Sequence, residues 1–107
     1  MSTVPLTLTV RSGDDGATTL ALGGELDIDT AARVEPELLL AAVGRPDVRL
    51  DLSGLTFCDT SGVDLIVRTR DRCAAHGGRL RVCGIPPRAG LVFRLLGVDR
   101  TLTCSFS

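Results

Sequence analysis

The chain of 107 residues contains no lysine, and its twelve basic residues are all arginine. The absence of lysine excludes a Walker A phosphate-binding loop and an enzyme that forms a Schiff base through lysine. Tryptophan, tyrosine, asparagine and glutamine are also absent, and phenylalanine occurs only three times. Because 44% of the residues are nevertheless apolar, we expect residues 1–107 to form a single domain with an aliphatic core.

Charge and hydropathy exclude further classes of protein. A net charge of −1 and a pI of about 5.7 give no basic surface of the kind that direct binding to nucleic acid requires. The longest apolar run, Leu38 to Val43, is far shorter than the roughly 18 residues of a membrane-spanning helix. Residues 1–5 lack the basic start and the apolar stretch of a secretory signal. We therefore expect a cytoplasmic protein without a membrane span.

The cysteines and the single histidine do not suggest a metal site. Cys58, Cys73, Cys83 and Cys104 form no Cys-x-x-Cys pair and have no histidine at metal-ligand spacing. We expect them to be reduced and to pack as small apolar residues. His76 stands at a predicted helix end, where the helix dipole favours a cation. The sequence predicts no metal, no cofactor and no catalytic residue, and hence a protein that is not an enzyme.

Hydrophobic periodicity predicts alternating strands and helices. Alternation of apolar residues predicts strands near 6–11, 20–22, 48–52, 80–82 and 102–106, and helical spacing predicts helices near 30–43, 61–76 and 86–96. The order ββαβαβαβ favours one α/β domain with a mixed sheet, in which an N-terminal hairpin precedes mostly parallel strands.

Several details of these elements are also predicted. Gly23 and Gly24 are expected to end the second strand, and Asp29 or Thr30 to cap the first helix. Pro36 is expected to bend that helix or to shift its start. In the last helix, Leu96 is expected to belong to the buried stripe.

The segment with most chemical information runs from Leu50 to Val63. A predicted strand leads through a loop to a helix that begins with Asp59, Thr60 and Ser61. The simplest interpretation is that Asp59 or Thr60 only caps the helix. A hydroxyl at a helix start is also a favourable place for a phosphate, because unsatisfied amides and the helix dipole favour negative charge there.

A receiver domain, which accepts phosphate on aspartate, has a similar order of strands and helices. Asp51 or Asp59 could be its acceptor. Such a domain also needs an acidic pair after its first strand and a lysine late in the chain. The lysine is missing, so this alternative is disfavoured.

Four segments together resemble STAS domains, the family of sulphate transporter and anti-sigma factor antagonist domains. The strand that leads into Asp59-Thr60-Ser61-Gly62 is similar to the family signature, in which Asp-Ser-Ser-Gly or Asp-Ser-Thr-Gly begins a helix. Gly24-Glu25-Leu26-Asp27, followed by Thr30-Ala31, resembles the start of the family's first helix. Residues 77–80 and 93–98 match its later strand and helix. The resemblance extends from about residue 6 to residue 104.

The resemblance implies an anti-sigma factor antagonist. The unphosphorylated form of such a protein binds an anti-sigma factor, often a serine/threonine kinase, and frees a sigma factor. Phosphorylation of the hydroxyl after the motif aspartate, which is Thr60 here, switches binding off. We expect a monomer or weak dimer. The expected partner-binding residues are Asp27, Asp29, Asp59, Thr60, Ser61, Gly62 and Val63.

An alternative within the same family remains open. A STAS accessory subunit of a transporter or of a stressosome-like signalling complex would have the same fold. Such a subunit would work without phosphorylation of Thr60.

Overall fold

The computed structural model describes residues 6–107, which form an α/β unit. Its elements are β1 (Thr7–Ser12), β2 (Thr18–Leu26), α1 (Ile28–Ala42), β3 (Asp47–Cys58), α2 (Thr60–Ala75), β4 (Arg79–Ile85), α3 (Pro87–Leu95), the short 3-10 helix η1 (Val98–Arg100) and β5 (Cys104–Phe106). This order confirms the predicted ββαβαβαβ arrangement. None of the helices in residues 6–107 is long and apolar enough to cross a membrane.

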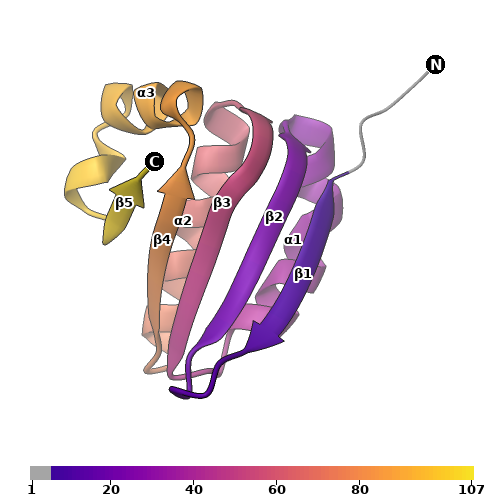
Figure 1. Ribbon diagram of the computed structural model, residues 1–107, viewed down its shortest axis with the longest axis vertical. Helices are drawn as coiled ribbons and strands as arrows, with labels where there is room; N and C mark the ends of the chain where they lie inside the picture. Colours follow the sequence, from indigo (N-terminus) through magenta and orange to yellow (C-terminus); the bar gives the residue numbers. More distant parts are fainter. Residues whose placement is uncertain (1–5) are drawn as a thin grey trace.

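The five strands form one mixed sheet in the order β1-β2-β3-β4-β5. β1 is antiparallel to β2, and the remaining neighbours are parallel. In Figure 1, α1 and α2 lie together behind the sheet, and α3 lies at the end where β3 and β4 finish. The carboxyl ends of β2 and β3 and the starts of α1 and α2 therefore meet at one edge of the sheet.

The core lies between the sheet and the helices. Alternate strand residues such as Leu20, Leu50 and Leu52 are fully buried, because they point from the sheet toward α1 and α2. Leu38 of α1 and Ile66 of α2 are fully buried on the facing side. Burial of each side chain of this size stabilises the fold by roughly 1.5 to 3 kcal/mol. This layer of aliphatic residues therefore holds α1 and α2, and with them the helix starts, against the sheet.

β2 is longer than the sequence predicted. The prediction that Gly23 and Gly24 end this strand was wrong, since β2 continues to Leu26. The register against β3 shifts on both sides of the glycine pair, and Gly24 has a φ of +103°. A Cβ atom on Gly54 of β3 would lie 3.3 Å from the Cα atom of Gly23, so the two backbones approach closely here. The glycines thus form a bulge that carries β2 onward to the start of α1.

α1 begins earlier than expected and runs through Pro36 without a break. A proline inside a helix leaves the carbonyl four residues earlier, here that of Ala32, without its usual partner. Both Pro36 and Ala32 are exposed, so water can bond to this carbonyl. The expected burial of Leu96 was wrong. Leu96 follows the last turn of α3 and is 48% exposed.

Candidate functional site

The two helices α1 and α2 begin side by side because β2 and β3 end side by side. Leu26, the last residue of β2, pairs with Cys58, the last residue of β3. Asp27 and Asp59 follow directly, and the Asp59 amide donates a hydrogen bond to the Leu26 carbonyl at 3.2 Å. The chain thus places two capping aspartates at one edge of the sheet.

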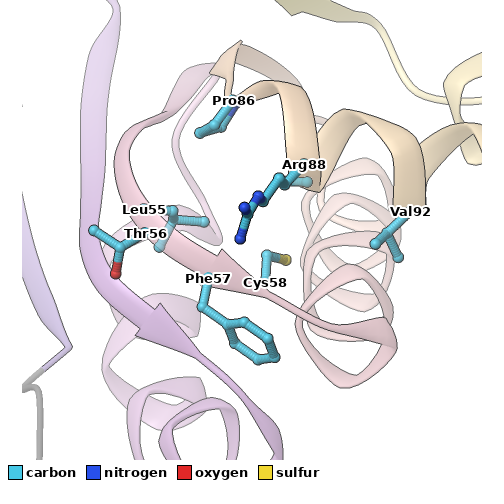
Figure 2. A pocket seen from close by; sticks show the side chains of 8 residues that line it. Leu55, Thr56, Phe57, Cys58, Pro86, Arg88 and Val92 are labelled. Atoms are coloured by element: carbon cyan, nitrogen blue, oxygen red, sulfur yellow. The ribbon is translucent and has the colours of Figure 1, made fainter.

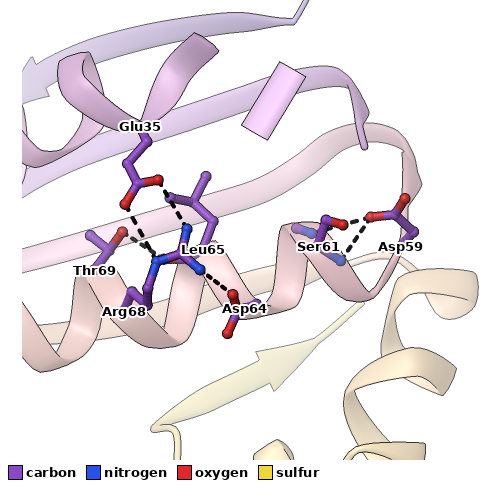
Figure 3. Close-up of polar contacts among 8 residues, drawn as sticks. Glu35, Asp59, Ser61, Asp64, Leu65, Arg68 and Thr69 are labelled. Carbon is purple, nitrogen blue, oxygen red and sulfur yellow. Dashed lines mark hydrogen bonds and ion pairs between the residues drawn. The ribbon is translucent and has the colours of Figure 1, made fainter. Parts of the chain in front are cut away.

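Asp59 caps α2, as one of the two sequence interpretations predicted. Its carboxylate accepts hydrogen bonds from the amides of Ser61 at 3.0 Å and Gly62 at 3.2 Å (Figure 3). These contacts satisfy two of the amides that lack a partner within the helix. Thr60 is the first helical residue and is exposed, whereas Ser61 is half-buried. Thr60 therefore lies exposed at the positive end of the helix dipole.

Asp27 caps α1, so the prediction of Asp29 or Thr30 as the cap was wrong. The Asp27 carboxylate accepts hydrogen bonds from the amides of Asp29 at 3.0 Å and Thr30 at 2.9 Å. In return the Asp27 amide donates to the Thr30 hydroxyl at 2.9 Å, which completes a capping box. The Thr30 hydroxyl also donates to the carbonyl of Glu25 at 2.7 Å and so ties α1 to the end of β2.

The hydrogen bond from the Thr30 amide lowers the pKa of Asp27 below its usual value of 3.8. A carboxyl whose pKa is lower in the folded state stabilises the fold above its unfolded-state pKa. This contribution is lost as the pH falls through the folded-state pKa. The effect of the cap on stability should therefore be complete at neutral pH and should fade in acid.

Asp27→Ala is expected to lower the free energy of unfolding at neutral pH, because the amides of Asp29 and Thr30 lose their acceptor. Urea unfolding over a range of pH measures this effect. The difference between wild type and Asp27→Ala should shrink as the pH falls below about 4. Asp29→Ala is the control for the loss of one negative charge at the same helix start, because the cap acceptor is Asp27 and not Asp29; its effect should be smaller. A difference that stays constant into acid would contradict the proposed role of the carboxylate.

Gly62 and Val63 are both buried, and Val63 is only 1% exposed. A Cβ atom on Gly62 would lie 2.7 Å from Leu26 Cγ and 2.9 Å from Cys58 Sγ. The first turn of α2 can pack against the ends of β2 and β3 only because residue 62 has no side chain. Val63 nevertheless lines the hollow next to Thr60 and Ser61, at its floor. Gly62 and Val63 pack beneath the exposed residues, and this packing holds Thr60 in position.

Two exposed apolar residues that the sequence analysis did not count among the partner-binding residues flank Thr60 and Ser61. A groove between α1 and α2 is lined by Ile28 and Ser61, and Ile28 is 68% exposed. A hollow of about 540 Å³ between α2 and the end of α3 is lined by Thr60, Ser61 and Leu96. Ile28 stands between Asp27 and Asp29 at the start of α1, outside the helical spacing of the buried residues. An apolar residue in this position was the sequence signal that could have identified it as part of the surface. The surface thus has a polar centre and apolar flanks.

The cation of α2 closest in sequence to Thr60 is already paired. Arg68 Nη2 lies 2.9 Å from Glu35 Oε1 of α1, and the same guanidinium bonds to Asp64 (Figure 3). The hydrogen bond to Glu35 raises the pKa of Arg68. The first turn of α2 contains no basic residue. A negative charge added at Thr60 would be repelled by Asp59 and Asp64. The first two turns of α2 contain no free cation that could neutralise it.

The four cysteines lie in the described part of the chain and are free there. Burial is the main cause that raises the pKa of Cys58 to about 12, and the nearby Asp59 adds to this. The thiol is therefore protonated at neutral pH and packs as an apolar group. Within residues 6–107, no group of three or more histidine, cysteine, aspartate or glutamate side chains could hold a metal ion.

Comparisons with known proteins agree on one family. The sequence model of the family described as "Mlab, STAS domain" matches residues 9–103. An anti-sigma-B factor antagonist of Staphylococcus epidermidis is 30% identical over 78 residues, which make up 72% of this chain and 72% of that protein.

Solved structures show the same fold. An anti-sigma factor antagonist from Mycobacterium paratuberculosis matches with a TM-score of 0.83 and 24% identity, over 94% of this chain and 85% of that one. The Bacillus cell fate determinant SpoIIAA in its phosphorylated form matches with a TM-score of 0.66 and 18% identity, over 94% and 91%. At these identities the structural likeness is evidence for the fold alone.

Proposed function

This chain belongs to the STAS domain family, and we propose that it is an anti-sigma factor antagonist. In this role it binds an anti-sigma factor and thereby frees a sigma factor for transcription. The observation that carries the proposal is the exposed Thr60 at the start of α2, held between exposed apolar residues. A curated relative of the same family, at 30% identity, is named as an antagonist of an anti-sigma factor.

The proposed binding surface is centred on Thr60 and Ser61. Ile28 and Leu96 extend it on the two sides as apolar contacts that a partner can bury. Asp29 and Asp59 contribute negative charge at its edge, although Asp59 also serves α2 as its cap. Gly62 and Val63 shape this surface from within. Ile28 and Leu96 supply exposed apolar surface of the kind that marks protein-binding sites.

Phosphorylation of Thr60 is the proposed off-switch, and the proposed kinase is the anti-sigma factor itself. Thr60 is an exposed residue, and a phosphate on its hydroxyl would carry a charge of about −1.5 to −2. The helix start tolerates this charge, so the fold survives the modification. A partner packed against the unmodified threonine would have to bury the new charge beside Asp59.

Replacement of an apolar flank should weaken binding of the partner. The partner is first captured with the unmodified chain and identified by mass spectrometry, and its affinity is then measured by calorimetry. We expect Ile28→Ser to reduce the affinity by about tenfold, since a contact of this kind contributes more than about 1 kcal/mol. Leu40→Ser is the matched control. Leu40 is 83% exposed on the same helix but lies about 18 Å from Ile28 along the helix axis.

Three outcomes would count against this proposal. Equal affinities for wild type and Ile28→Ser would place the surface elsewhere. An effect of Leu40→Ser as large as that of Ile28→Ser would show a general loss of folding or solubility. Capture of transporter subunits instead of an anti-sigma factor would favour the accessory-subunit alternative.

A further inference from the structure

A second groove lies between the carboxyl-terminal part of β3 and α3. It has a volume of about 200 Å³, and its lining includes neither Thr60 nor Ser61 (Figure 2). Its inner surface is mainly apolar, because Leu55 and Cys58 come from β3 and Ala89 and Val92 come from α3. Phe57 also lines the groove and is 49% exposed. The proposed switch at Thr60 makes no use of this groove.

A single cation reaches into this apolar groove. The Arg88 side chain extends from the first turn of α3 toward β3, between Leu55 and Cys58 (Figure 2). No acidic residue lines the groove, and α3 contains none. Among residues 6–107, Arg88 forms no ion pair, whereas Arg68 and Arg81 are each held by a carboxylate of another element. The groove thus combines apolar walls with one uncompensated positive charge.

We propose that this groove binds a segment of a protein partner in which an apolar side chain stands beside a carboxylate. A cavity of about 150 Å³ can hold a benzene molecule, so a groove of this size admits one leucine or phenylalanine side chain. The Arg88 guanidinium can pair with the adjacent carboxylate through two parallel hydrogen bonds. The pair would form at the rim of an apolar site, where it is less screened than in open water.

The surroundings favour a protein segment over a small free acid. Phe57 adds exposed apolar surface to the lining of the groove, and Leu91 of α3, which is 57% exposed, lies outside that lining. Leu91 lies three residues after Arg88 and so on the same side of α3. A small molecule that filled the groove would contact Phe57 but would leave Leu91 uncovered. A peptide segment would cover them together with the groove.

Selection from a random peptide library, with the unmodified full chain as bait, tests this proposal. We expect the selected peptides to share leucine or phenylalanine next to aspartate or glutamate. Synthetic copies of these peptides should bind about tenfold more weakly to Arg88→Gln than to wild type. Arg72→Gln, which alters an exposed arginine on the last turn of α2, should bind them like wild type. In nuclear magnetic resonance spectra, the peptides should shift the amides of residues 55–58 and 88–92.

Each contrary result has a defined meaning. Selected peptides without an acidic residue, or peptides that bind Arg88→Gln and wild type equally, would overturn the proposal. Shifts of the same amides by free phenylacetate but not by the peptides would replace the protein segment with a small acid. Peptides that lose binding to Thr60→Glu would occupy the Thr60 surface, which would overturn this inference but leave the proposed switch intact. Conversely, failure of the switch would not affect binding in the groove.

Discussion

Phosphorylation of Thr60 is expected to reduce the affinity for the partner by about a hundredfold, which corresponds to a loss of about 3 kcal/mol. The phosphate adds close to two negative charges at the centre of the proposed surface. Asp59 precedes it, Asp64 follows one turn later, and Arg68 is already paired with Glu35 and Asp64. An interface that closes over Thr60 would bury a dianion without a cation to neutralise it.

Calorimetric titration of the captured partner with unmodified and phosphorylated protein measures this loss. Thr60→Ala should bind the partner but no longer respond to the kinase. Thr60→Glu should weaken binding only in part, because a carboxylate carries one charge and has a different shape. Circular dichroism should be similar for all forms, since the change lies at a helix end that tolerates charge. Equal affinities of the two forms, or phosphate found at Ser61 alone, would contradict the mechanism.

The order of the elements could be predicted because it depends on local periodicity. Alternating leucines and valines predicted each strand of the core, and the helical spacing around Val34 and Leu38 predicted α1. The end of β2 could not be predicted in the same way. Gly23 and Gly24 have the composition of a turn, but their place in the fold depends on Gly54. That contact joins segments about 30 residues apart, and no local pattern contains it.

In the candidate site, too, some features could be predicted from local patterns, whereas others depend on how distant segments pack. The motif around Thr60 left Asp59 and Thr60 open as the cap of α2, and the structure shows that Asp59 is the cap. The cap of α1 was misplaced, because Asp29 and Thr30 fit a cap as well as Asp27 until the path of β2 is known. The exposure of Leu96 and the burial of Val63 also depend on how α2 and α3 pack. Burial that is set by neighbouring elements is the part that the sequence alone did not reveal.

Gly62 shows how packing beneath the surface controls the position of Thr60. Its Cβ would meet Leu26 Cγ at 2.7 Å, Leu26 Cδ2 at 2.8 Å and Cys58 Sγ at 2.9 Å. Leu26 is fully buried and Cys58 nearly so, and neither can move without disturbing the ends of β2 and β3. Any side chain at residue 62 therefore has to push the first turn of α2 away from the sheet.

Gly62→Val is accordingly expected to lower the free energy of unfolding by about 2 to 3 kcal/mol, the cost of an overpacked core. For a domain of this size the thermal midpoint should fall by roughly 10 °C or more. The same substitution two residues earlier is the matched control. Thr60→Val adds valine at an exposed position and conserves the side-chain shape, so its stability should equal that of wild type.

The two valine variants should also differ in function. Gly62→Val displaces Thr60 and should bind the partner poorly even at temperatures where it is folded. Thr60→Val should bind normally and should not accept phosphate. Addition of Leu26→Ala to Gly62→Val removes the Cγ and Cδ2 atoms that clash, so the double variant should be more stable than the sum of the two single changes predicts. Unfolding in urea measures all three. Simple additivity, or a Gly62→Val variant as stable as wild type, would show that α2 does not rest on Leu26.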